Sequence, residues 1–149
     1  MNLHLDGTNT IQAPRDRVYA LLTSPEFLSR SLPDAEEVRV TGPQSLEARL
    51  KVRVAVVSST LKMMLNIAKT DPPTKATLTA EGEGSGSHLK IASVFTLSGE
   101  SSTSMGWAAD AEITGVMAGL GSTLLKGFAT KKVAEIFEGI TKAVEAEAK

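Results

Sequence analysis

The sequence contains no cysteine, which excludes disulfides, thiolate nucleophiles and zinc sites built on thiolates. It has only two histidines, His4 and His88, which lie far apart on strand-like segments and are expected to face solvent rather than bind metal. Aromatic residues are few (one Trp, one Tyr and four Phe), and the formal net charge is −1. The basic, aromatic-rich face of a nucleic-acid-binding protein is therefore missing. We expect no metal ion, no cofactor and no nucleic-acid partner.

Long apolar runs are missing as well. The longest uncharged stretch, Ile113 to Leu125, has 13 residues, whereas a membrane-spanning helix needs about 20. The first residues show neither a basic start nor an apolar run, so no targeting peptide is expected. A chain of 149 residues fits a single domain, residues 1–149, and can bury a core without disulfides or metals. These features favour a soluble, cytoplasmic protein.

The N-terminal part of the chain combines a strand with two short helices. Residues 3–11 alternate loosely between apolar and polar side chains, which indicates a strand. Pro14 suits the first position of a helix that runs through Leu22. Residues 24–26 (Ser-Pro-Glu) repeat this pattern with a capping serine, a proline and an acidic first turn. A second short helix is therefore expected, ending near Leu32.

Apolar and polar side chains then alternate with a period of two over most of residues 38–113, which is typical of antiparallel strands with one buried face. The apolar phases are Leu46, Ala48, Leu50, Val52, Val54 and Val56; Leu61, Met63, Leu65 and Ile67; Ala76, Leu78 and Ala80; Leu89, Ile91, Phe95 and Leu97; and Met105, Trp107, Ala109, Ala111 and Ile113. The glycine-rich residues 81–87 lie between two strands rather than between a strand and a helix. They predict a hairpin connection and not a phosphate-binding loop.

From Gly115 onward the apolar period becomes 3.6, which predicts one C-terminal helix of about 30 residues. The order of one strand, two short helices, about six antiparallel strands and a long helix indicates an α+β fold. The long helix must lie across the inner face of the sheet. Its first turns contain Gly119, Gly121 and Gly127, and each glycine costs a helix about 1 kcal/mol relative to alanine.

This order is similar to the helix-grip fold of START lipid-transfer domains, in which a curved antiparallel sheet, here of about seven strands, wraps around a long C-terminal helix. The local sequence also resembles the G-subunit-like family of carbon monoxide dehydrogenase, within the SRPBCC superfamily. Four segments carry this resemblance: residues 13–22, residues 24–28 leading to Leu32-Pro33, residues 70–73 with 80–84, and residues 121–137. The chain has Ser31-Leu-Pro-Asp34 where family members commonly have Cys-Leu-Pro-Gly, so no thiol can act there.

The resemblance implies a hydrophobic cavity between the sheet and the long helix that holds an apolar molecule. It also implies a role beside a molybdenum-containing hydroxylase of the carbon monoxide dehydrogenase type, through assembly, membrane recruitment or quinone supply. These implications come from the family and not from composition or periodicity. A shared fold does not by itself establish function.

The inward phases supply the mostly apolar wall that such a cavity needs. The candidate ligand-binding wall consists of Leu28, Leu32, Leu61, Met63, Leu65, Ile91, Phe95, Trp107, Met117, Leu120, Leu124 and Phe128. Each of these residues can equally belong to an ordinary core. We expect Gly119 and Gly121 to form a lid, because small residues leave room for a ligand and lower the local stability of the helix. Leucine at either glycine should then reduce ligand uptake with the fold intact.

A catalytic alternative is a polyketide cyclase-like enzyme that acts in the same cavity. Such an enzyme needs acid–base groups that point inward. The acidic residues of the strands instead fall on the outward phase: Glu81, Glu83, Asp110 and Glu112. The polar candidates on the inward phase are Asn9 and Ser93, with Lys69 at a strand end, and they form no evident nucleophile–base pair. We therefore assign no catalytic residue and favour non-enzymatic binding of a lipid or isoprenoid quinone.

A third hypothesis concerns Lys126, Lys131 and Lys132, which lie close together on the long helix. These lysines could contact an acidic partner protein, such as a molybdenum hydroxylase, or the inner face of the membrane. They also fit an ordinary solvated helix face. The sequence leaves both explanations open.

Overall fold

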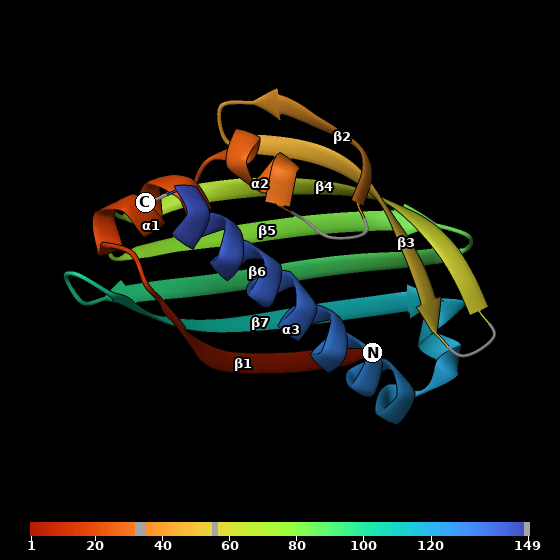
Figure 1. The fold of residues 1–149 in the computed structure, drawn as a ribbon. Coiled ribbons are helices and arrows are strands. Elements are labelled where there is room, and N and C mark those ends of the chain that lie inside the picture. Colours follow the sequence, from red (N-terminus) through yellow and green to blue (C-terminus); the bar gives the residue numbers. More distant parts are fainter. Residues whose placement is uncertain (32–34, 55–56, 148–149) are drawn as a thin grey trace.

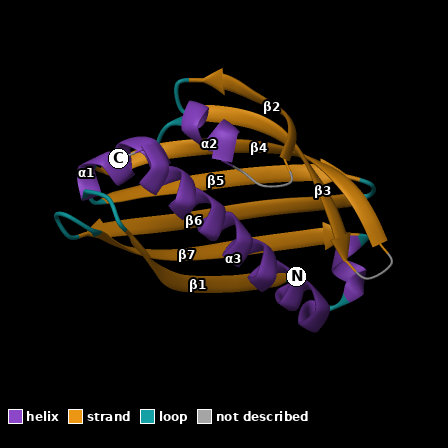
Figure 2. Ribbon diagram, viewed as in Figure 1, coloured by secondary structure: helices purple, strands orange, loops and turns teal. Residues whose placement is uncertain are grey.

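The computed structural model describes residues 1–31, 35–54 and 57–147. Within these ranges, one seven-stranded sheet carries its helices on a single face (Figure 1; Figure 2). The strands are β1 (Asn2–Ile11), β2 (Ala35–Gly42), β3 (Ser45–Val54), β4 (Val57–Asp71), β5 (Lys75–Gly84), β6 (Ser87–Ser98) and β7 (Thr103–Gly115). The helices are α1 (Arg15–Leu22), α2 (Pro25–Ser31), the short 3-10 helix η1 (Met117–Leu120) and α3 (Ser122–Glu147). The predicted α+β fold is confirmed, whereas Leu32 and Val56 lie outside the described residues.

The strands follow the order β1-β7-β6-β5-β4-β3-β2, and every neighbouring pair is antiparallel. The register places the predicted apolar phases of adjacent strands directly opposite one another. One continuous inward row consists of Leu3, Ala111, Ile91, Ala80, Leu65 and Leu46. Because successive side chains alternate between the two faces, the residues between these rows face outward. The sheet therefore has one apolar face, and α3 runs obliquely across it (Figure 1).

The two short helices begin within one residue of the predicted positions. Ser24 caps α2, since its hydroxyl accepts a hydrogen bond from the Phe27 amide at 3.3 Å. Pro14 occupies the position just before α1, and its carbonyl accepts the first helical hydrogen bond from the Val18 amide at 2.9 Å. Phe27 is only 2% exposed and joins α2 to the core at one end of the sheet.

The long helix begins later than predicted. One continuous helix was expected from Gly115, but η1 and α3 are separate helices joined at Gly121. Gly121 has a φ of 92°, a conformation that favours glycine because it has no Cβ atom. The Leu125 amide donates to the Gly121 carbonyl at 3.1 Å and starts α3. The backbone turn therefore explains Gly121, and leucine there is expected to disturb the fold rather than leave it intact.

A pair of alanine substitutions tests this explanation. Gly121→Ala should lower the free energy of unfolding by about 1–3 kcal/mol, because alanine disfavours its positive φ. Gly127→Ala should raise it by about 0.5–1 kcal/mol, because Gly127 lies inside α3 with no atom near an added Cβ. Urea denaturation of both variants would measure these changes. Equal effects at the two positions would contradict the assignment of Gly121 to a turn.

The buried core consists of two clusters rather than one. The α1–α2 cluster includes Val18, Phe27, Leu46, Met105, Ile140 and Val144. The η1 cluster includes Leu61, Met63, Ile113, Met117 and Leu125. Leu65 packs against both clusters without being buried itself. The molecule is thus well packed toward the two ends of α3 and less so between them.

Candidate ligand-binding cavity

The middle of the inward face of the sheet is incompletely covered. Leu65, Leu78, Ile91, Trp107 and Ala109 all belong to inward rows, yet each is only half-buried. The α3 backbone contacts mainly β1, β3, α2 and η1, and it contacts the central strands β4, β5 and β6 less. Protein interiors are normally close-packed. The half-buried apolar residues therefore mark a part of the inward face that the helices cover incompletely.

Two grooves lie beside α3. The β1–α3 groove, of about 580 Å³, is lined by Leu5, Asp6, Gly7, Thr8, Asn9, Thr10, Trp107, Thr130, Val133, Ala134, Phe137, Glu138, Thr141, Lys142 and Glu145. The α3-tip groove, of about 790 Å³, is lined by Arg53, Val54, Leu120, Gly121, Ser122, Thr123, Leu124, Gly127, Phe128 and Lys131. Both volumes fall in the range of small-molecule sites, which is about 300–1,000 Å³. The two grooves differ in charge, since acidic residues line the first and basic residues line the second.

The structure distributes the predicted wall residues over several environments. Leu28, Leu61, Met63 and Met117 are buried in the two packed clusters. Leu65, Ile91, Phe95 and Trp107 are half-buried on the inward face of the sheet. Leu120, Leu124 and Phe128 line the α3-tip groove. The last two groups are not fully buried in the packed clusters, so they are the stronger candidates for ligand contact.

The predicted lid glycines differ in their surroundings. Gly119 lies in η1, where an added Cβ would meet no atom within 4 Å. Gly121 lines the α3-tip groove but has its own backbone reason to be glycine. A lid made by these residues remains a prediction. The space next to Gly119 is open, so a larger side chain there would not displace a buried ligand directly.

Several residues of the grooves were missed by the sequence analysis. Phe137 stacks on Trp107, with ring centroids 4.7 Å apart and an interplanar angle of 24°. Leu5 and Thr141 also line the β1–α3 groove. The helical periodicity placed Phe137 on the apolar side of α3, and that signal could have identified it. The helical periodicity did not identify Thr141. Thr141 lines the groove because β1 lies beside this part of α3, and that placement depends on the pairing of β1 with β7.

The polar groups on the inward face are bonded within the protein. Ser93 donates its hydroxyl hydrogen to the Leu78 carbonyl at 3.1 Å. Asn9 accepts a hydrogen bond from the Trp107 indole Nε1 at 3.1 Å, whereas Lys69 is exposed to solvent. Within the described part of the chain, these residues form no nucleophile–base pair. Glu81, Glu83, Asp110 and Glu112 are exposed, as their outward phase predicted.

Tyr19 is a further polar residue near the inward face. Its hydroxyl donates to the Lys75 carbonyl at 2.9 Å, and its ring lies 6.5 Å from that of Phe95. Burial, with a further contribution from the negative charge of Asp71, raises the pKa of Tyr19 above its usual value of 10.0. The hydroxyl is therefore neutral at physiological pH and supplies no base.

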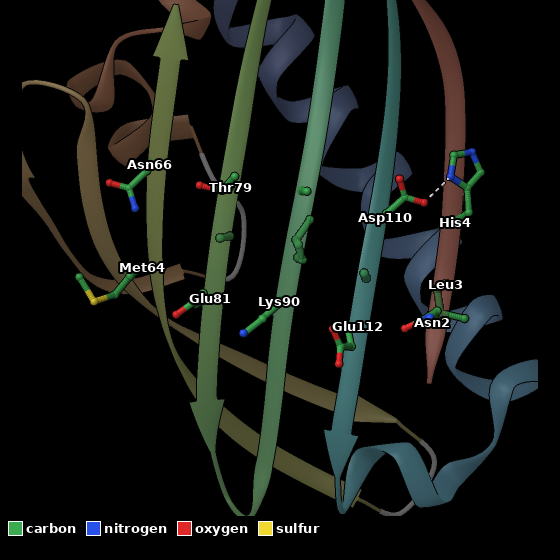
Figure 3. Close-up of a pocket in the computed structure, with 14 residues that line it drawn as sticks. Asn2, Leu3, His4, Met64, Asn66, Thr79, Glu81, Lys90, Asp110 and Glu112 are labelled. Atoms are coloured by element: carbon green, nitrogen blue, oxygen red, sulfur yellow. Dashed lines mark hydrogen bonds and ion pairs between the residues drawn. The ribbon is translucent and has the colours of Figure 1, made fainter.

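Another surface depression, of about 800 Å³, lies on the opposite face of the sheet (Figure 3). It is a shallow surface on which His4 contacts the carboxylates of Asp110 at 2.7 Å and Asp6 at 3.0 Å. Hydrogen bonds to these two carboxylates raise the pKa of His4. Among the described residues, no three His, Asp or Glu side chains are placed to hold a metal ion. Exposed charged side chains, among them Glu81, Lys90 and Glu112, line this face, whereas the face beneath α3 carries the half-buried apolar residues and is the stronger candidate for an apolar ligand.

Comparison with solved structures identifies the fold. A conserved protein from Geobacillus kaustophilus superimposes with a TM-score of 0.86 at 21% identity, covering 99% of this chain and 98% of that chain. The Zhui aromatase/cyclase from Streptomyces sp. R1128 has a TM-score of 0.69 at 15% identity, with 100% and 97% covered. A START superfamily protein from Mycobacterium smegmatis has a TM-score of 0.64 at 15% identity, with 97% and 96% covered. The fold is therefore of the helix-grip, START type.

Sequence comparison identifies the family. No curated protein is significantly similar to the chain. The model of the CoxG family, named for the G subunit of carbon monoxide dehydrogenase, matches residues 7–145, from within β1 to near the end of α3. This range includes both grooves beside α3 apart from the first lining residues of β1. The resemblance found in the four sequence segments is thus confirmed over almost the whole chain, which belongs to the CoxG family of carbon monoxide dehydrogenase.

Proposed function

We propose that this protein binds a hydrophobic small molecule, such as a lipid or an isoprenoid quinone, between α3 and the sheet, without catalysing a reaction. The observation that carries this proposal is the row of half-buried apolar residues beneath α3, between two packed clusters. Apolar surface left exposed to water favours a ligand that covers it. Family membership and the helix-grip fold of its structural neighbours support a ligand-binding role.

A cyclase-like activity is the alternative, because the fold is shared with the Zhui aromatase/cyclase. The two polar residues that the sequence placed on the inward phase of the strands, Asn9 and Ser93, are both hydrogen-bonded within the protein. This arrangement favours binding over acid–base chemistry. Turnover of a polyketide-like substrate that is lost in Ser93→Ala would establish the alternative instead.

Thermal unfolding in the presence of candidate ligands tests the binding proposal. A ligand that binds only the folded protein stabilises it by about 2.7 kcal/mol at a concentration 100 times its dissociation constant. Isoprenoid quinones and fatty acids, added separately from detergent-free stocks, should include at least one that raises Tm with increasing concentration. If no compound of either class binds or raises Tm, the proposal is wrong.

A contact with the membrane would give an apolar ligand a route into the protein. None of the helices in the described ranges has the length and apolarity needed to cross a bilayer. Leu124 in the first turn of α3 is 43% exposed, however, and Val116, just before η1, is 54% exposed. Lys126, Lys131 and Arg53 are exposed nearby, and two of them line the α3-tip groove. Exposed apolar side chains with a basic rim are typical of surfaces that bind anionic membranes.

Lys132 is less suited to this role than the sequence suggested. Its ammonium group lies 3.4 Å from the Glu135 carboxylate and 5.9 Å from the centre of the Phe128 ring. Both interactions hold it against α3. The proposed membrane contact therefore rests on Lys126 and Lys131 rather than on all three lysines.

Vesicle binding tests the proposed contact. Reversing the charge of both Lys126 and Lys131 (to Glu) should weaken sedimentation with phosphatidylglycerol-containing vesicles, at about 1 kcal/mol per lysine removed. The control reverses Lys62 and Lys90, which are exposed on the outward face of the sheet. Equal losses in the two double variants, or no binding by the wild type, would contradict a membrane contact at the α3 tip.

A molybdenum-containing hydroxylase of the carbon monoxide dehydrogenase type is the partner that the family suggests. The support for this partner is family membership alone. We propose that the bound molecule, if it is a quinone, serves electron transfer from such an enzyme. Co-purification of the two proteins from the source cells, dependent on the bound molecule, is the expected observation.

A further inference from the structure

The two edge strands of the sheet differ in how well they are protected from pairing with another chain. At one edge, the pairing of β2 with β3 is interrupted by register shifts between Glu36 and Arg39 and between Val40 and Gly42. Such irregularities and charged side chains commonly protect an edge strand. At the other edge (Figure 1), β1 pairs with β7 without a shift over all 10 of its residues and contains no proline, lysine or arginine. β1 therefore lacks the usual protection.

Hydrogen bonds at the N-terminus fix which backbone groups of β1 face this edge. The Met1 ammonium group donates to the Ile113 carbonyl at 3.0 Å, and the Ile113 amide donates to the Met1 carbonyl at 2.8 Å. In an antiparallel ladder, hydrogen-bonded pairs alternate with pairs that are not hydrogen-bonded. The odd-numbered residues of β1 therefore bond to β7, and the even-numbered residues point their N–H and C=O groups away from it. Among the described residues, the backbone groups of Asp6, Thr8 and Thr10 have no partner on that side.

The β1–α3 groove runs along this free edge. It is lined by every residue from Leu5 to Thr10. Successive side chains of a strand point to opposite faces of the sheet, so a groove that touches all of them must follow the edge of the strand rather than one face. The amide of Gln12, the next even-numbered residue, donates to the Glu145 carboxylate of α3 at 2.8 Å. The free edge of β1 therefore faces α3 across the groove.

The lining of the groove favours a cationic occupant. On the α3 side, Val133 contributes apolar surface and Glu138 and Glu145 contribute carboxylates, to which β1 adds that of Asp6. Lys142 is the basic residue among the lining side chains, and it is paired with Glu138 at 3.1 Å. An excess of carboxylates attracts basic groups and repels acidic ones.

We propose that the β1–α3 groove binds an extended, basic segment of a partner protein, which adds to the seven-stranded sheet as a further strand antiparallel to β1. The backbone of the segment bonds to Asp6, Thr8 and Thr10, as in other cases of peptide recognition by strand addition. Its side chains alternate between basic residues beside Asp6 and apolar residues that face α3. At 3.4 Å per residue, the edge from Leu5 to Thr10 is about 17 Å long and accommodates about six residues. The inference goes beyond the proposed binding of a small apolar molecule and does not depend on it.

Two N-methylated peptides test strand addition without changing the protein. The probe is an acetylated and amidated hexapeptide that alternates lysine with valine. When its lysines lie beside Asp6, its lysine amides point toward β1 and its valine amides point away. Methylation of the lysine amides should weaken binding at least about tenfold, because it removes several backbone hydrogen bonds. Methylation of the valine amides should leave the affinity unchanged.

NMR titration of the protein amides gives both the affinity and the location of the peptide. The amides of Asp6, Thr8 and Thr10 should shift on binding and become protected from hydrogen exchange. The hexapeptide with glutamate in place of lysine should bind at least about tenfold more weakly, because of the acidic lining.

Thr8→Pro and Thr8→Ala form a matched pair of protein variants. Proline removes an N–H that faces the free edge, a position where edge strands tolerate proline, so the β1–β7 ladder should be retained. Thr8→Pro should weaken binding of the lysine–valine peptide about fivefold, which is the effect of one lost hydrogen bond. Thr8→Ala keeps the N–H and should bind as the wild type does. If Thr8→Pro disturbs the amide spectrum of the free protein, the methylated peptides decide the question.

Four results would overturn the proposal. The lysine–valine peptide could fail to bind, or the two methylated peptides could bind equally well. Equal affinity for the glutamate peptide would show that the partner segment is not selected by its basic charge. If the protein alone forms a dimer in analytical ultracentrifugation and Thr8→Pro abolishes it, a second copy of the chain occupies the edge instead.

Discussion

Replacing Ala109 by phenylalanine is expected to weaken the binding of apolar ligands strongly while the protein remains folded. Ala109 is a half-buried residue on the inward face of β7, opposite Ser93 on one side and Leu5 on the other. These residues belong to the half-buried part of the inward face, where we propose that the ligand lies, and a phenyl ring at position 109 would compete with the ligand for that place. The affinity for any ligand found by thermal unfolding should fall by at least about tenfold, or 1.4 kcal/mol.

The same substitution on the other face of the sheet is the control. Ala92 is exposed on β6 and faces away from α3, so Ala92→Phe adds the same ring to solvent. Ligand affinity should be unchanged in this variant. The Tm of Ala109→Phe without ligand should equal or exceed that of the wild type, because the ring occupies existing space. A large loss of stability without any ligand would instead mean that the region beneath α3 is already packed.

Two leucine truncations are expected to differ strongly in their effect on stability. Leu46 and Leu78 both point inward from the sheet, but Leu46 is 0% exposed whereas Leu78 is half-buried. Leu46→Ala should cost about 3–4 kcal/mol of unfolding free energy, because it leaves a cavity in the packed α1–α2 cluster. Leu78→Ala should cost about 1–2 kcal/mol, since its side chain makes fewer packing contacts.

Chemical denaturation of the two truncation variants measures this difference directly. Adding a saturating ligand should increase the gap in stability between wild type and Leu78→Ala, because the truncation removes part of the ligand contact. The gap for Leu46→Ala should stay the same. Equal costs for the two substitutions without ligand would show a uniformly packed interior and would contradict a space beneath α3.

The sequence was sufficient to predict the order of the elements and the direction of the strand side chains. The period of two around Leu46 and Trp107 required one apolar sheet face, and the period of 3.6 in residues 122–147 required a helix to cover it. The acidic residues of β5 and β7 are exposed for the same reason. Family membership followed from short segments whose resemblance is spread over most of the chain.

The details of the candidate site depended on pairings that periodicity does not specify. The chain closes by pairing β1 with β7, which brings Asn9 next to Trp107 and places β1 beside α3. Gly121 looked like a small residue inside a helix, but its positive φ ends η1 and turns the chain into α3. Leu65 and Leu78 are half-buried because of the distance at which α3 crosses the sheet. Packing at the two ends of the helix sets that distance, so the periodicity of one segment does not predict it.

The presence of an extractable apolar molecule in the purified protein tests the central claim most directly. Native mass spectrometry of the wild type should show a mass above that of the chain alone, and solvent extraction should remove the added mass. Ala92→Phe should retain the adduct, and Ala109→Phe should lack it. A wild-type protein that shows only the mass of the bare chain, and takes up neither quinone nor fatty acid when these are supplied, would contradict the account.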